Sequence, residues 1–186
     1  MTRRLRTARR LVLLATFLVL AGCGGDEEVA GGSADLPGPV PAAVEYANPP
    51  SSSLPAPPFR GELLDGVAVD GQELWAERPY LVVFTASFCD RCRNIHRAAA
   101  AAVDSFDGAA GLLGVVGEDD RNGAVDYAEE LDLGHPIAVA SERTWLNYAA
   151  REPGLIVLVA GNRVVRGWPT GAAEADSEAA LDELIS

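Results

Sequence analysis

Positive charge is scarce in this sequence of 186 residues. It contains no lysine, and its 15 arginines face 27 aspartates and glutamates, which gives a formal net charge of −12. Five of the arginines fall in residues 1–10, so the rest of the chain holds ten arginines and a net charge of −17. Such an acidic surface repels phosphate groups, and we therefore exclude nucleic acids and anionic lipid headgroups as binding partners.

Long apolar runs are also lacking. The longest covers 12 residues, 11–22, whereas a membrane-spanning helix needs about 20. An arginine-rich start followed by a short apolar run predicts a signal peptide over residues 1–22. The run ends in Leu20-Ala21-Gly22-Cys23, which resembles the bacterial lipobox. This resemblance implies cleavage before Cys23, lipid attachment to its sulfur and an anchor on the extracytoplasmic side of the cell membrane. An ordinary secretory signal with an incidental cysteine is the alternative.

Cysteine is the third scarce residue type, with three in the whole chain. If Cys23 carries lipid, only Cys89 and Cys92 remain, and they have no alternative partners. An extracytoplasmic compartment permits disulfides. A single pair separated by two residues therefore indicates a working redox couple rather than a staple that holds a scaffold together.

Most of the prolines lie in one segment. Residues 24–58 hold eight of the twelve, together with glycine, serine, alanine and acidic residues. Such a segment cannot bury enough apolar surface to offset the entropy cost of ordering it. We therefore predict that residues 23–58 are a lipidated N-terminus and flexible tether. Residues 59–186 are long enough for one domain with its own core.

The two cysteines lie where a predicted strand meets a predicted helix. Residues 80–84 form a short apolar run after Pro79, which is typical of a buried strand, and apolar residues recur at helical spacing from Cys92 onward. Cys89 is thus expected on the exposed turn and Cys92 one turn into the helix. The N-terminus of a helix stabilises a thiolate, the reactive form of cysteine. Cys89 is therefore the predicted nucleophile, and Cys92 the resolving thiol that attacks a mixed disulfide on Cys89.

The remaining elements predict an α/β fold. Strands are expected at 59–64, 67–69, 112–116, 136–140, 155–159 and 163–167, and helices from 119 to about 134, at 142–150 and at the C-terminus. The order of elements favours strand 80–84 lying parallel to strand 112–116. The turn at 160–162 makes the last two strands an antiparallel hairpin. Together these features indicate a mixed central sheet with helices on both sides.

The sequence resembles the thioredoxin superfamily, and within it the membrane-anchored thiol:disulfide oxidoreductases of the TlpA/ResA type. The resemblance rests on the strand 78–84, the redox turn Ala86-Ser87-Phe88-Cys89-Asp90-Arg91-Cys92-Arg93, and Glu152-Pro153-Gly154 before the next apolar run. It implies a thioredoxin-like fold and a cis peptide at Pro153, and it implies that Glu152 and Pro153 bind the partner polypeptide. A trans proline that ends the helix before it, at Ala149-Ala150, is the alternative.

The same resemblance implies the partners. They are cysteine-containing exported proteins or an apocytochrome, as in cytochrome c maturation, with electrons from a membrane thiol carrier. The redox-active disulfide serves in place of a cofactor, no metal is required, and the protein is expected to be a monomer.

The sequence departs from the family at the groups that accept protons. Thioredoxins keep a buried acid where this chain has Val83, and TlpA/ResA-type proteins often carry a glutamate where it has Ile95. Cys92 must therefore lose its proton to water, to Glu152 or to another group. Between the cysteines, Arg91 would stabilise the Cys89 thiolate and Asp90 would oppose it, so both are expected to tune the redox couple.

A metal-binding module is the alternative function. His96 follows Cys92 by four residues, so it lies on the same side of the predicted helix. Cys89, Cys92 and His96 could form a three-ligand copper or zinc site of a metallochaperone, with His135 as a fourth ligand.

Overall fold

The computed structural model describes residues 29–132 and 134–186. The predicted signal peptide, residues 1–22, and the predicted lipid attachment site, Cys23, lie outside these residues. No helix in the described part of the chain is both long enough and apolar enough to cross a membrane.

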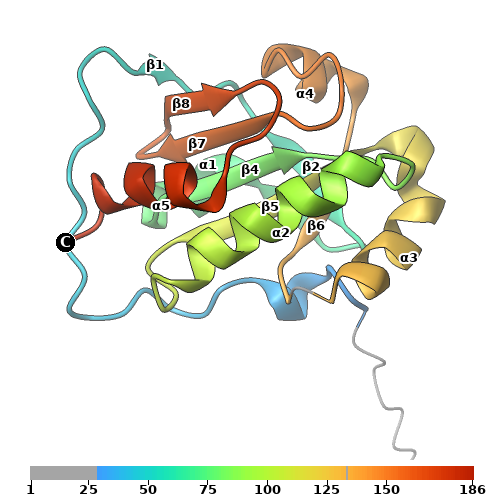
Figure 1. Cartoon of the computed structure of the whole chain (residues 1–186), viewed down its shortest axis with the longest axis horizontal. Coiled ribbons are helices and arrows are strands. Elements are labelled where there is room, and N and C mark those ends of the chain that lie inside the picture. Colours follow the sequence, from blue (N-terminus) through green and yellow to red (C-terminus); the bar gives the residue numbers. More distant parts are fainter. Residues whose placement is uncertain (1–28, 133) are drawn as a thin grey trace, which may run out of the picture.

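A single mixed sheet organises the molecule (Figure 1). Its strands are β1 (Leu54–Pro55), β2 (Arg60–Leu63), β3 (Ala68–Asp70), β4 (Tyr80–Phe84), β5 (Gly111–Gly117), β6 (Ile137–Ala140), β7 (Ile156–Ala160) and β8 (Arg163–Trp168). They lie in the order β1-β8-β7-β4-β5-β6-β2-β3. Strand β4 pairs parallel with β5 and antiparallel with β7, and β7 forms an antiparallel hairpin with β8. The expected mixed sheet is therefore confirmed.

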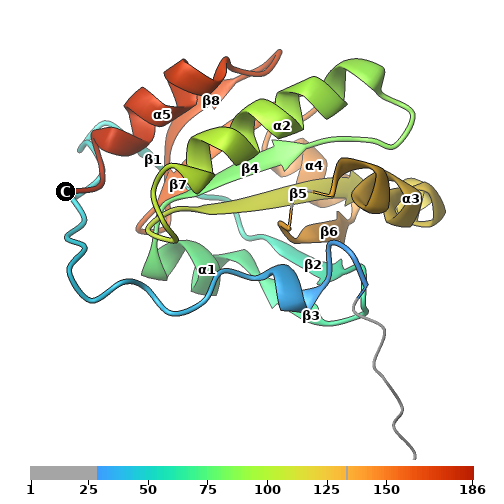
Figure 2. The same cartoon turned by 60° about the horizontal axis from the view of Figure 1, so that its bottom comes forward.

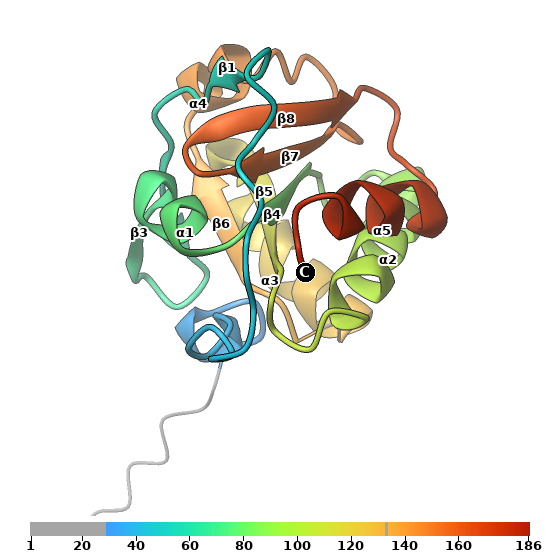
Figure 3. The same ribbon diagram turned by 90° about the vertical axis from the view of Figure 1, so that its left-hand side faces the viewer.

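Helices cover both faces of the sheet (Figures 2 and 3). They are α1 (Gly71–Glu77), α2 (Asp90–Asp104), α3 (Arg121–Leu131), α4 (Glu142–Asn147) and α5 (Glu174–Asp182), with the short 3-10 turns η1 (Ser33–Asp35) and η2 (Glu118–Asp120). Because β4 lies between two helical layers, all five of its side chains are buried. Val82 and Phe84 pack on the side of α1 and α4, whereas Leu81 and Val83 pack on the side of α2 and α5.

Helix α1 was not among the predicted elements. Its seven residues are too few to show a helical period, but Asp70 caps it by accepting a hydrogen bond of 2.9 Å from the backbone of Gln72. Trp75 is fully buried, and its ring packs edge-on against Phe59 at 5.5 Å between centroids. Tertiary packing of one large aromatic residue thus stabilises a helix that has little stability by itself.

Part of the segment predicted to be a flexible tether contacts the domain. Tyr46 donates a hydrogen bond of 2.8 Å to the backbone of Ala109, strand β1 pairs with β8, and Leu36 packs against the core. These contacts have a physical reason. The segment needs no core of its own, because the domain supplies both partners for its backbone and an apolar surface for its few large side chains.

Candidate active site

Cys89 and Cys92 lie at the corner between β4 and α2, as the sequence predicts. Cys89 is the residue that immediately precedes α2, and Cys92 is in the first turn of that helix. A disulfide joins them, with an S–S distance of 2.04 Å and 5.3 Å between the Cα atoms. The backbone N–H of Cys92 donates to the carbonyl of Cys89 at 2.9 Å, which closes the turn. Cys89 is therefore the N-cap residue of α2, at the helix end that carries unpaired N–H groups and the positive end of the dipole.

The two sulfurs differ in their access to solvent. Cys92 is fully buried, whereas Cys89 is partly exposed. The neighbouring Phe88 is 75% exposed, which is unusual for a large apolar side chain. A partner molecule can therefore reach Cys89 beside an apolar contact surface, while Cys92 can be reached only from Cys89.

The loop before β7 lies across the redox turn. The backbone of Gly154 donates to the carbonyl of Phe84 at 2.7 Å, and the guanidinium of Arg91 donates to the carbonyl of Pro153 at 2.8 Å. Pro153 is partly buried and Glu152 is exposed. The structure thus places Pro153 beside Arg91 of the redox turn, whereas Glu152 makes no hydrogen bond or ion pair with the described residues.

The prediction of a cis peptide at Pro153 is wrong, because no cis peptide bond occurs in the described residues. The trans form before proline is favoured by about 0.5–1 kcal/mol unless the surroundings require the other isomer. Here Ala149, with φ of 57°, and Gly154, with φ of 113°, turn the chain into β7. Since these positive φ values already reverse the backbone, the turn does not depend on a cis bond.

Each charged residue of the redox turn makes an ion pair or a hydrogen bond. Asp90 pairs with Arg93 at 3.3 Å, and Arg93 also contacts Glu130 at 3.0 Å. Arg91 instead bonds to an uncharged carbonyl. The negative charge of Asp90 is therefore partly balanced, whereas the positive charge of Arg91 has no acidic partner in the described residues.

No acidic residue is buried in the described part of the chain. Val83 is fully buried at the position where thioredoxins keep an acid. Ile95 packs against Gly171, where a Cβ atom would come within 2.7 Å of its side chain. Because an apolar residue occupies each of the two family positions, Cys92 has no buried carboxylate to take its proton.

Beneath the redox turn a short chain of polar side chains is buried instead. The hydroxyls of Thr85 and Tyr127 lie 2.7 Å apart, and the Tyr127 hydroxyl lies 3.2 Å from Nδ1 of His96. Burial raises the pKa of Tyr127 to about 12. Burial, and to a lesser degree the charge of His135, lowers the pKa of His96 to about 3. All three side chains are therefore uncharged at neutral pH.

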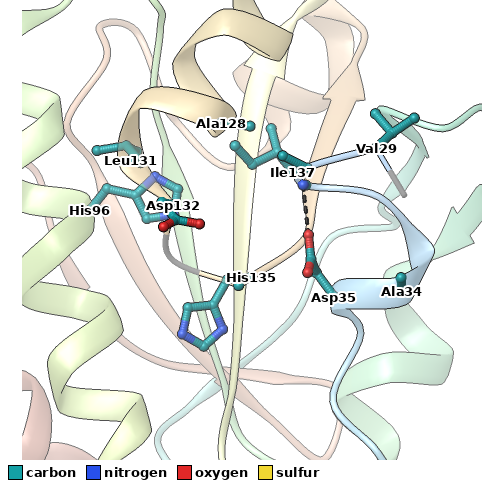
Figure 4. A pocket seen from close by; sticks show the side chains of 12 residues that line it. Val29, Ala34, Asp35, His96, Ala128, Leu131, Asp132, His135 and Ile137 are labelled. Carbon is teal, nitrogen blue, oxygen red and sulfur yellow. Dashed lines mark hydrogen bonds between the residues drawn. The ribbon is translucent and has the colours of Figure 1, made fainter. Parts of the chain in front are cut away.

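The described residues do not bring together the ligands of the alternative metal site, and Cys89 and Cys92 are joined in a disulfide. His96 uses Nδ1 toward Tyr127, and its Nε2 is buried without a hydrogen-bond partner in the described residues. His96 and His135 line a cavity of about 200 Å³ that is bounded by α3 and residues 29–35 (Figure 4). In that cavity Asp35 accepts a hydrogen bond of 2.7 Å from Gly31. The described residues contain no cluster of three or more histidine, cysteine or acidic side chains placed to hold an ion.

A groove beside the redox turn was missed from the sequence. It is lined by Phe88 and Pro153, by η2 and by three residues of α4, Glu142, Trp145 and Leu146. One signal could have located part of it. The segment after β5 lies at the carboxyl end of a strand parallel to β4, which is where ligand sites gather in such sheets.

Known structures share this architecture. A thiol:disulfide interchange protein of the thioredoxin family from Chlorobium tepidum is 17% identical, with a TM-score of 0.60 over 72% of this chain and 97% of that one. A DsbF homologue from Corynebacterium diphtheriae is 14% identical, with a TM-score of 0.63 over 76% of this chain and 92% of that one. A secreted disulfide oxidoreductase of Mycobacterium tuberculosis, described as homologous to DsbE of E. coli, is 14% identical, with a TM-score of 0.55 over 67% of this chain and 94% of that one.

These likenesses show that the chain has a thioredoxin-like fold, as the sequence resemblance implies. No protein-family model matches the sequence. No curated protein matches it either.

Proposed function

We propose that this protein is a thiol:disulfide oxidoreductase that exchanges its Cys89–Cys92 disulfide with cysteines of other polypeptides. One observation carries the proposal. A disulfide with one partly exposed and one buried sulfur lies at the N-terminus of α2, at the strand-to-helix corner of a thioredoxin-like fold. Two of the similar solved structures, those from Chlorobium tepidum and Mycobacterium tuberculosis, are named as a thiol:disulfide interchange protein and a disulfide oxidoreductase, which supports the same chemistry.

The exchange has two steps. In the reducing direction the Cys89 thiolate attacks a partner disulfide, forms a mixed disulfide and releases one partner thiolate. The Cys92 thiolate then attacks Cys89, which restores the Cys89–Cys92 bond and releases the second partner thiolate. The partner gains two electrons and the protein loses two. Because no acid is buried in the described residues, the proton of Cys92 leaves through water or through the exposed carboxylate of Glu152.

The proposal includes a location and partners. Lipid on Cys23 would hold the domain at the extracytoplasmic side of the cell membrane, where it would meet exported cysteine-containing proteins or an apocytochrome. A membrane thiol carrier would supply electrons.

The reduction potential of the couple tests the proposal. The domain is equilibrated with glutathione buffers of graded potential, its free thiols are trapped by alkylation, and the reduced fraction is read by mass. A two-electron transition between about −120 and −270 mV, the range of known exchange proteins, supports the function. A disulfide that no buffer in this range reduces, or a reduced pair that does not react with an oxidised peptide, contradicts it.

Arg91→Ala is expected to slow alkylation of Cys89 in the reduced protein about threefold at neutral pH. The reason is that the guanidinium, which has no acidic partner, stabilises the thiolate. The measurement is the rate of reaction with iodoacetamide as a function of pH. Arg97→Ala removes an equally exposed arginine two turns into α2 and serves as the control. An unchanged rate for Arg91→Ala contradicts the assigned role.

A further inference from the structure

The groove beside the redox turn has a volume of about 710 Å³ and extends from Phe88 and Pro153 to η2 and α4. Phe88, the residue directly before Cys89, lines one end of this groove. A polypeptide whose sulfur reaches Cys89 can therefore place the residues beside its cysteine in the groove.

The floor of the groove is apolar. Phe88 is 75% exposed and Leu146 is 59% exposed, and they are two of the four large apolar side chains that the described residues expose. Between them the ring of Trp145 packs edge-on against Phe84, with 5.2 Å between the centroids. A side chain packed on a buried ring loses little freedom on binding, so this floor can hold an apolar side chain of a partner at low entropic cost.

The rim of the groove is acidic. Three exposed carboxylates, those of Glu118, Asp119 and Glu142, line it without any side-chain hydrogen bond or ion pair to the described residues. A fourth, Asp120, accepts a hydrogen bond of 2.6 Å from the backbone of Ser87 and so fixes the redox turn. The single cation in the lining is Arg151. Unpaired charges of one sign around an apolar floor favour an occupant of the opposite charge.

We propose that this groove selects partner polypeptides that carry arginine or lysine, together with an apolar residue, close to the cysteine that reacts with Cys89. The inference rests on the proposed function and names its substrate class. A single ion pair at an exposed rim contributes little binding energy. The three carboxylates therefore act together, mainly by raising the rate at which a basic partner meets the groove. We expect the effect to appear in kcat/KM at low salt.

The test uses three cyclic peptides with one internal disulfide. They share their sequence except for two positions beside the first cysteine, which are arginine, asparagine or glutamate. Reduction of each peptide by the reduced protein is followed by stopped-flow fluorescence. The expected kcat/KM for the arginine peptide is about tenfold that for the glutamate peptide in about 20 mM salt. The ratio should approach one in about 0.5 M salt, where the screening length falls to a few ångströms.

Matched variants show whether the groove causes the preference for the arginine peptide. In the combined variant Glu118→Gln, Asp119→Asn and Glu142→Gln, the arginine-to-glutamate ratio should fall to about twofold or less. The control changes the same number of exposed acidic residues elsewhere, as Glu129→Gln, Glu178→Gln and Asp182→Asn. This control variant should have the same arginine-to-glutamate ratio of kcat/KM as the natural protein.

The outcomes separate the two proposals. Equal rates for all three peptides overturn the charge selection but leave the oxidoreductase intact. If the control variant loses the preference for the arginine peptide as fully as the groove variant does, the effect comes from the net charge of the protein. This result also overturns the inference. A protein that reduces none of the peptides, nor hydroxyethyl disulfide, overturns the proposed function itself.

Discussion

Cys89→Ser is expected to abolish disulfide exchange, with a fall of about 100-fold or more in the rate of peptide reduction. A serine hydroxyl does not ionise at neutral pH and cannot form a disulfide. Cys92 cannot substitute for it, because its side chain is fully buried and no partner disulfide can reach its sulfur. The measurement is the initial rate of peptide reduction by the reduced protein, compared with the natural sequence under the same conditions.

Cys92→Ser supplies the matched control. Cys89 remains exposed and can still attack, but nothing resolves the mixed disulfide that it forms. This variant should therefore accumulate a covalent complex of one protein with one peptide, visible as an added mass that a reductant removes. If Cys92→Ser turns over like the natural protein, or if Cys89→Ser forms the complex instead, the assigned order of attack is wrong.

The central part of the fold could be predicted because its signal is local. Residues 80–84 are a continuous apolar run, and β4 has those bounds in the structure. The paired cysteines lie one helical turn apart in sequence, so their proximity needed no knowledge of the rest of the chain. The parallel pairing of β4 with β5 followed from the order of elements.

The features that could not be predicted depend on contacts between distant residues. Composition alone predicted that residues 24–58 are a tether. In the structure Tyr46 hydrogen-bonds to a residue 63 positions away, and Leu36 packs against the core of the domain. The trans bond at Pro153 occurs beside a positive φ at Gly154 and a hydrogen bond from Arg91, neither of which the sequence shows. The groove joins residues from three segments that only the sheet brings together.

The other prediction with a large effect concerns stability in mild acid. His96 is buried and its pKa is lowered to about 3, mainly by burial, from an ordinary value near 6.5. As the pH falls below 6.5 the unfolded chain binds a proton at this residue, whereas the folded protein does not until about pH 3. The free energy of unfolding therefore decreases across this window, by about 2 kcal/mol between pH 7.5 and pH 5 from this residue alone.

His96→Gln is expected to remove that dependence, because glutamine keeps a polar group beside Tyr127 but does not titrate. Urea unfolding at pH 7.5 and pH 5 gives the difference in free energy for each protein. Carboxylates also contribute to that difference, but they contribute equally in both proteins, so the comparison isolates His96. His135→Gln changes the partly exposed histidine that contacts Asp104 and should behave like the natural protein. If His96→Gln loses as much stability on acidification as the natural protein, the ring is not buried in its neutral form.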